Sequence, residues 1–355
     1  MKIFLTGAFG NVGVSTLEEL LKRGHQVKCF DIRNSFNEKI FKRYKDKVEV
    51  FWGDLRNIED IKRAVDNEEF DVVVHLAFII PKLSTTGLES EKAPDIAREI
   101  NVGGTGNLVK VLKGLPKTPK IIFTSSLHIY GRTQDKEPPR TVFDIPQPVE
   151  HYSHHKLQCE EIIKSSGLEW SIFRLAATLP LRLKLDSGMF DVPLNNRMEF
   201  VHTKDVGLAI ANGVESEEIW RKILHIGGGR DCQLYYGDMT ERILSSIGVG
   251  MLPEEAFTKI PFPTDWLDTE ESQKILKYQT RGLDDYIKEV KELMGYKIYL
   301  IKIFKPFIRI GLLLKSKYYK NICLSVYGRE LLEKVHKDEI LSNAFYLKNI
   351  VVKYQ

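Results

Sequence analysis

A glycine-rich turn between a short strand and a helix constrains the fold of this chain more than any other feature. The run at 2–6 is apolar and strand-like, and TGAFGNVG follows it at 6–13. Glycines permit a tight turn, a close approach of the backbone to a ligand, and close packing of helix on strand. Amides at the start of a helix also attract an anion. The turn therefore predicts a parallel α/β sheet that binds a pyrophosphate group at its first loop.

An acidic residue after the next strand sharpens this prediction. Asp31 ends a strand-like run and stands 18 residues after Gly13, where a carboxylate can accept hydrogen bonds from the ribose hydroxyls of a dinucleotide. Its charge would repel a 2′-phosphate, so we expect NAD, while Lys28 and Arg33 leave NADP open as the alternative. No Lys-Ser or Lys-Thr pair follows the glycines, which argues against a P-loop.

Short β-branched or aromatic runs alternate with helical stretches through the first half of the chain. This alternation is typical of a parallel sheet with crossover helices, and continuous apolar runs indicate strands buried on both faces. We predict strands over 2–6, 26–31, 48–52, 72–76, 120–125 and 170–175. The expected fold class is an α/β, Rossmann-type doubly wound parallel sheet with a small C-terminal substrate lobe and a basic apolar C-terminal extension.

We expect three parts along the 355 residues. The dinucleotide-binding domain spans 1–174 and gains later sheet contributions from about 200–230, the substrate lobe spans 175–295, and the extension spans 296–355. The four cysteines lie far apart and form no C-x-x-C pair. Met1 leads directly into the first strand and leaves no room for a signal peptide, so a cytoplasmic location is expected.

The formal net charge of +4 is unevenly distributed. Residues 296–355 hold 12 Lys+Arg against 4 Asp+Glu, and residues 1–295 hold 40 against 44. The body therefore does not predict nucleic-acid binding. Three cations and Pro306 within the apolar run at 298–314 argue against a membrane-spanning helix. We expect an amphipathic element over 296–320 that lies on an anionic membrane, packs on the body, or joins a second subunit in a homodimer.

A tyrosine and a lysine stand four residues apart at the start of a helix predicted over 152–165. Tyr152 and Lys156 leave the same helix face, and an ammonium near a phenol lowers the phenol's pKa from about 10 toward neutrality. Such pairs are common on helix surfaces, so the position of this pair in the fold decides whether it is functional. Ser125 and Ser126 end a strand at the sheet edge where open α/β sheets bind ligands. We therefore predict Tyr152 as a general acid/base.

Other polar residues near this helix predict no site of their own. His151, His154 and His155 do not form the H-x-x-x-H pattern with a third ligand, so no metal is expected. Arg174 is expected to support the edge of the sheet rather than to hold a substrate phosphate.

Several short motifs resemble, in order and spacing, the extended short-chain dehydrogenase/reductases and, within them, the NAD-dependent epimerase/dehydratase family. Beside the glycine turn and Asp31, the motifs are GDL at 53–55, HLAF at 75–78, NVGGTGNL at 101–108, TSSLHIYG at 124–131 and YSHHK at 152–156. The resemblance covers about residues 1–230.

The resemblance implies a role for each matching residue. Tyr152 is the implied catalytic base, Lys156 binds the nicotinamide ribose and lowers the tyrosine pKa, and Ser126, with Ser125 as second choice, orients the substrate. The expected cofactor-binding residues are Gly7, Gly10, Asn11, Val12, Gly13, Asp31, Arg33, Asp54, Leu55, Leu76, Ala77, Phe78, Asn101, Tyr152 and Lys156.

Two departures from the family pattern narrow the expected activity. Leu127 and His128 stand where the 4,6-dehydratase branch carries an Asp-Glu pair, which argues against dehydration by that route. Only 25 residues, 175–199, separate Arg174 from Phe200, so the substrate lobe is small or rebuilt.

We expect NAD-dependent hydride transfer at a hydroxyl-bearing carbon of a small-molecule substrate, with a sugar nucleotide 4-epimerase-like activity first. The alternatives are an NAD(P)-dependent reductase or dehydrogenase of a smaller or lipid-like alcohol, and a non-catalytic dinucleotide-binding sensor or scaffold.

Overall fold

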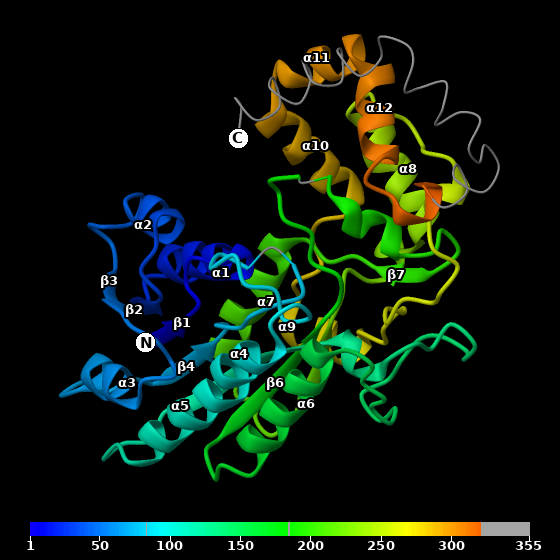
Figure 1. Ribbon diagram of the computed structural model, residues 1–355. Helices are drawn as coiled ribbons and strands as arrows, with labels where there is room; N and C mark the ends of the chain where they lie inside the picture. The colour runs from blue at the N-terminus through cyan, green and yellow to red at the C-terminus, as the bar shows by residue number, and fades with distance from the viewer. Residues whose placement is uncertain (83, 184, 321–355) are drawn as a thin grey trace.

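A seven-stranded, entirely parallel sheet forms the centre of the computed structural model, which describes residues 1–320 apart from 83 and 184. The strand order is β3-β2-β1-β4-β5-β6-β8 (Figure 1). The strands are β1 (Lys2–Thr6), β2 (Gln26–Asp31), β3 (Glu49–Trp52), β4 (Val72–His75), β5 (Lys120–Ser126), β6 (Trp170–Leu175) and β8 (Ile223–Ile226). The six predicted strands lie within one residue of these bounds, and the Rossmann-type fold class is confirmed.

The order of the strands reverses between β1 and β4. The chain starts at β1, runs outward to β3, and returns to pair β4 with the free side of β1, so that Thr6 lies opposite His75. Open α/β sheets bind their ligands outside the carboxyl ends of the strands, at such a reversal of strand order.

Helices cover both faces of the sheet because successive side chains of each strand point to opposite faces. In β1, Ile3 and Leu5 enter one core, while Phe4 between them enters the other. The first core holds α1 (Asn11–Lys22) and α7 (Thr203–Glu215), and the second holds α3 (Ile58–Val65), α5 (Gly104–Lys113) and α6 (His151–Lys164). Shorter helices flank these layers: α2 (Ser35–Phe41), α4 (Pro94–Arg98) and α9 (Glu270–Leu276).

A third apolar core makes a C-terminal lobe beyond the carboxyl edge of the sheet (Figure 1). It contains the antiparallel pair β7 (Arg197–Glu199) and β9 (Gln233–Tyr235). Its helices are α8 (Tyr236–Ser246), α10 (Leu283–Met294), α11 (Lys297–Ile303) and α12 (Lys305–Leu313). Between the two strands of the lobe, the chain returns to the sheet to add α7 and β8.

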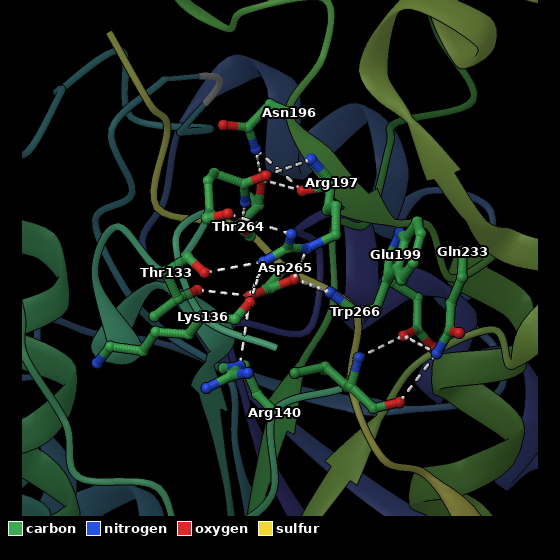
Figure 2. Close-up of polar contacts among 12 residues, drawn as sticks. Thr133, Lys136, Arg140, Asn196, Arg197, Glu199, Gln233, Thr264, Asp265 and Trp266 are labelled. Atoms are coloured by element: carbon green, nitrogen blue, oxygen red, sulfur yellow. Dashed lines mark hydrogen bonds and ion pairs between the residues drawn. The ribbon is translucent and has the colours of Figure 1, made fainter. Parts of the chain in front are cut away.

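A buried carboxylate fastens the lobe to the loop at 131–150, which precedes α6. Asp265 is fully buried and accepts hydrogen bonds from Nε of Arg197 at 2.6 Å and from the hydroxyl of Thr133 at 2.7 Å. Nε of Arg140 lies 3.3 Å from the same carboxylate (Figure 2). Because Thr133 and Arg140 belong to the loop and Arg197 belongs to β7, one negative charge joins three distant segments.

The role of Asp265 in holding the lobe can be tested by a substitution that removes its charge at nearly constant volume. Breaking a buried ion pair typically costs about 3–5 kcal/mol, so we expect Asp265→Asn to lower the free energy of unfolding in urea by that order. The exposed pair of Asp284 with Arg242 offers a control, since Asp284→Asn should change stability by less than about 1 kcal/mol. Equal, small losses for the two variants would show that Asp265 does not hold the lobe.

Candidate active site

A cavity of about 350 Å³ lies at the carboxyl edge of the sheet, where the strand order reverses. Loops that follow six parallel strands contribute to its wall. The predicted site residues that line it are Gly7, Gly10, Asn11, Val12, Gly13, Asp31, Asp54, Leu55, Leu76, Ala77, Phe78, Ser126, Tyr152 and Lys156. The fold thus brings predicted site residues between positions 7 and 156 into the lining of one cavity, the glycine turn and Tyr152 among them.

The glycine turn forms a cradle that a larger residue would fill. Gly7 has a φ of +69°, and a Cβ there would lie 2.6 Å from the amide nitrogen of Ala77. A Cβ on Gly13 would lie 2.1 Å from the carbonyl oxygen of Gly7. Gly10 caps α1 without a side-chain hydrogen bond, so no side chain occupies the anion-attracting end of the helix. This backbone fits a pyrophosphate group.

Asp31 has a structural role as well as a place in the cavity wall. Its carboxylate accepts hydrogen bonds from the amides of Phe9 at 2.9 Å and Ile32 at 2.8 Å, and from the side chain of Asn37 at 3.1 Å. Burial raises the pKa of Asp31 to about 6, although the two amide hydrogen bonds act to lower it. Asp31 therefore fastens the glycine turn to β2, a role that its spacing alone did not predict.

Two predicted cofactor-binding residues lie outside the cavity wall. Arg33 is exposed, and its Nε donates to Glu38 at 2.7 Å. Asn101 is buried, where its amide group accepts from the backbone nitrogen of Ile79 at 2.6 Å and donates to the backbone oxygen of Ile79 at 2.9 Å. Asn101 thus holds the loop after β4 in place, and Arg33 forms an exposed ion pair with Glu38 outside the cavity wall.

Lys156 lies in the cavity wall and is buried beside the rings of Phe78 and Phe123. Its ammonium donates to the carbonyl oxygen of Thr124 at 2.6 Å and lies 3.5 Å from the ring centre of Phe78. Burial lowers the pKa of Lys156 to about 7. One carbonyl uses only one of the three protons of the ammonium, so the group retains donors for a ligand.

The expected lowering of the Tyr152 pKa is wrong for this cavity. Burial raises the pKa of Tyr152 to about 12, and a hydrogen bond with Ser126 offsets only part of this effect. The ammonium of Lys156 lies 5.8 Å from the ring centre of Tyr152, and its own charge is weakened by burial. Desolvation therefore outweighs the attraction between ammonium and phenolate on which the sequence argument relied.

Both serines at the end of β5 line the cavity, but their hydroxyls differ in environment. The Ser126 hydroxyl accepts a hydrogen bond from the amide of His128 at 3.2 Å. The Ser125 hydroxyl is buried and has no hydrogen-bond partner among residues 1–320 as described. An unpartnered hydroxyl at this place is available to a ligand, so the geometry keeps Ser125 beside Ser126 as a substrate-binding candidate.

Glu91 is a site residue that the sequence analysis missed. Its two carboxylate oxygens accept from the amides of His151 at 3.1 Å and Tyr152 at 2.9 Å, which caps the first turn of α6 from outside. Glu91 belongs to the loop after β4, and Ser84 and Thr85 of that loop line the cavity. Sixty residues separate Glu91 from α6, and no short motif marks such a contact.

We expect Glu91→Ala to lower the free energy of unfolding by about 1–2 kcal/mol, because it removes an anion and two hydrogen bonds from a helix N-terminus. Denaturation in urea measures this loss. Glu89→Ala is the matched control, since Glu89 only pairs with Lys92 on the same loop, and its loss should stay below about 0.5 kcal/mol. An identical loss in the two variants would exclude a capping role for Glu91.

Two features are absent from the part of the chain that the structure describes. Among these residues, no three His, Cys, Asp or Glu side chains are grouped to hold a metal ion, His151, His154 and His155 included. Likewise, no helix within the described ranges is long and apolar enough to cross a membrane.

Comparison with known proteins agrees with this geometry. Residues 3–179 match the model of the NAD dependent epimerase/dehydratase family. A UDP-glucose 4-epimerase from Pisum sativum is 31% identical over 221 residues, which cover 58% of this chain and 61% of the relative. Methionine adenosyltransferase 2 subunit beta from Rattus norvegicus is 27% identical over 175 residues, or 49% of this chain and 46% of the relative.

Among solved structures, UDP-glucuronic acid 4-epimerase from Bacillus cereus, in complex with UDP-glucuronic acid and NAD, superposes with a TM-score of 0.68. The two sequences are 21% identical, and the superposition covers 82% of this chain and 100% of the Bacillus cereus chain. The two proteins therefore share a fold. The match to the pea relative spans 61% of that relative's length.

Proposed function

Because residues 3–179 make this chain a member of the NAD-dependent epimerase/dehydratase family, we propose that it is an NAD-dependent enzyme with a sugar nucleotide 4-epimerase-like activity. One observation carries the proposal. A single cavity holds the glycine turn and Asp31 at one end and Ser126, Tyr152 and Lys156 at the other.

The residues of the cavity fit NAD. The cradle at Gly7 and Gly13 admits only backbone and suits the pyrophosphate, and Asp31 offers a carboxylate to ribose hydroxyls. Lys156 has free ammonium protons for the second ribose. When bound, NAD supplies a ring carbon that accepts and returns a hydride.

The chain's own contribution to the reaction is proton transfer and orientation. The Ser126 hydroxyl, with Ser125 beside it, would hold the reacting oxygen of the substrate. Tyr152 would take the proton of that hydroxyl when its carbon is oxidised and return a proton when the carbon is reduced on its other face. A positively charged group that binds beside the phenol would lower the pKa of Tyr152 from about 12. Binding in the cavity and ionisation of Tyr152 are therefore coupled.

A sugar nucleotide is the substrate class that the relatives support. The pea relative is a UDP-glucose 4-epimerase, and the Bacillus cereus structure holds UDP-glucuronic acid. One observation favours the alternative of a less polar alcohol, since Leu127, Leu175, Ala176 and Ala177 make part of the cavity wall apolar. The presence of Ser126, Tyr152 and Lys156 in one cavity speaks against a purely non-catalytic sensor, which needs no such group.

We also propose that the protein works in a reducing compartment such as the cytoplasm. Cys29, Cys159 and Cys232 are buried free thiols, and proteins of oxidising compartments more often pair their cysteines.

Tyr152→Phe tests the proposed chemistry. We expect turnover of UDP-hexoses to fall by about 10²–10⁴-fold, because the variant lacks the proton acceptor, while NAD binding changes little. Assays of epimer formation and of NAD reduction against a panel of sugar nucleotides and simple alcohols would also identify the substrate class. Tyr235→Phe, on the exposed edge of the lobe, is the control. Full activity of Tyr152→Phe would remove Tyr152 from the mechanism.

The raised pKa of Asp31 predicts how NAD affinity depends on pH. The ionised carboxylate of Asp31 can accept hydrogen bonds from ribose hydroxyls at both of its oxygens, whereas a protonated carboxyl carries a proton on one of them. The affinity for NAD should therefore fall as the pH drops through about 6, by about tenfold at pH 5. Titration calorimetry of NAD binding at several pH values measures this. In Asp31→Asn the dependence should vanish, and Asp31→Ala should weaken NAD relative to NADP.

Asp54 provides the matched control for this pH dependence. It also lines the cavity, but hydrogen bonds from Arg56 hold its pKa below the usual value although burial acts to raise it. Asp54→Asn should therefore leave the loss of affinity near pH 6 intact. If this loss persists in Asp31→Asn as well, another group is responsible.

A further inference from the structure

One ionisable side chain in the cavity wall has no part in the proposed reaction. The titratable residues that line the cavity are Asp31, Asp54, His128, Tyr152 and Lys156. Asp31 and Asp54 are expected at the cofactor, while Tyr152 and Lys156 serve proton transfer and ribose binding. An imidazole can gain and lose a proton near neutral pH, so His128 is a proton-transfer group whose chemistry is unassigned.

The backbone and the ring of His128 are both held in place beside Ser126 and Tyr152. His128 belongs to the single 3₁₀ turn Leu127–Tyr130, which directly follows β5. Its amide donates to the hydroxyl of Ser126 at 3.2 Å. Its ring meets the ring of Tyr152 edge-on, with 5.7 Å between the ring centres and 88° between the planes. Phe262 of the lobe contacts the same imidazole, with 5.4 Å between the ring centres. These contacts fix the imidazole next to the phenol.

A carboxylate determines which nitrogen of this ring is free. Nδ1 of His128 lies 2.7 Å from a carboxylate oxygen of Glu150, and the two side chains are only 17% and 19% exposed. An ionised carboxylate can only accept, so Nδ1 carries the proton of this hydrogen bond. In the neutral ring, Nε2 then holds a lone pair, and it makes no hydrogen bond to any residue that the structure describes. Glu150, the N-cap residue of α6, thus orients His128 as a base.

We propose that His128, oriented by Glu150, is a second proton-transfer residue that acts on the carbon next to the one that the enzyme oxidises. The inference rests on the proposed function, because it needs the carbonyl group that hydride transfer leaves on the substrate. A carbonyl group makes the hydrogens of its neighbouring carbons acidic, and a positioned imidazole can then remove one of them. The hexose of a sugar nucleotide has such hydrogens on both sides of its fourth carbon.

The step balances without an additional reactant. Nε2 of His128 takes the proton, the electron pair of the C–H bond forms a carbon–carbon double bond, and the carbonyl oxygen gains the negative charge. Tyr152 is in its phenol form once it has taken the hydroxyl proton of the substrate, so its O–H can donate to this oxygen. Return of a proton from the imidazolium to the same carbon restores the carbonyl group.

Exchange with solvent separates this step from epimerisation alone. In 4-epimerisation the hydride leaves the carbon and returns to it, so no carbon-bound hydrogen comes from water. A proton held on Nε2 exchanges with water before it returns, so the proposed step replaces the hydrogen on the neighbouring carbon. Delivery of this proton to the other face would also invert that carbon.

Deuterium incorporation tests the proposal on the full chain with NAD in heavy water. UDP-glucose is one probe, and UDP-4-ketoglucose is the second, because it already carries the carbonyl group and needs no hydride transfer. We expect NMR to show deuterium on a carbon next to the fourth carbon of both probes, above the incorporation in buffer.

Two substitutions should remove this exchange. His128→Gln should slow incorporation about 100-fold relative to epimer formation, since a general base is lost. Glu150→Gln should slow it at least about tenfold, because the glutamine amide donates to Nδ1 and moves the ring proton to Nε2. His154→Gln is the matched control, since His154 is an exposed residue of α6, and it should incorporate deuterium normally.

The two probes distinguish this proposal from the proposed function. Epimer formation without deuterium in the unaltered chain overturns the role of His128 and leaves the epimerase in place. Deuterium in UDP-4-ketoglucose without turnover of UDP-glucose supports the role of His128 and counts against the epimerase, and the absence of both overturns both. Equal incorporation by His128→Gln and His154→Gln, at equal thermal midpoints, would show that the pair of His128 with Glu150 is only structural.

Discussion

The contact between the turn after β1 and the turn after β4 is the constraint on which the rest of the site depends. The backbone of Gly7 approaches Ala77 so closely that a single methyl group would not fit between them. This approach sets the glycine turn beside the residues that follow β4. Glu91, in the loop after β4, accepts a hydrogen bond from the amide of Tyr152 in the first turn of α6. One steric contact therefore relates the two ends of the cavity.

Burial is the dominant electrostatic effect in the cavity. It raises the pKa of Asp31 and Tyr152 and lowers that of Lys156, which favours the uncharged form of each. Arg174 shows the opposite case: burial acts to lower the pKa of its guanidinium, but two hydrogen bonds to the carboxylate oxygens of Glu160 raise it above the usual value. Asp31 and Lys156 form no ion pair with any residue among those the structure describes, so the charges at this part of the cavity are left to be set by what binds.

The sequence predicts the sheet and most of the cavity wall because their signals are local. Apolar runs mark the strands, and Gly7, Gly13 and Asp31 lie within one strand–helix–strand unit. Glu91 and Asp265 could not be predicted in this way, since each contacts a segment tens of residues away. The spacing of Tyr152 and Lys156 gave their common location, but the Tyr152 pKa depends on how deeply the surrounding segments bury the ring.

The cap that Glu91 places on α6 has a consequence for recognition. The same loop forms part of the wall that a ligand would touch and holds the amide of Tyr152. A ligand that shifts this loop must then also shift the field at the phenol, and by thermodynamic linkage the protonation of Tyr152 alters the affinity for that ligand by the same factor. Substrate selection and proton transfer would thus both depend on the same conformational equilibrium of this loop.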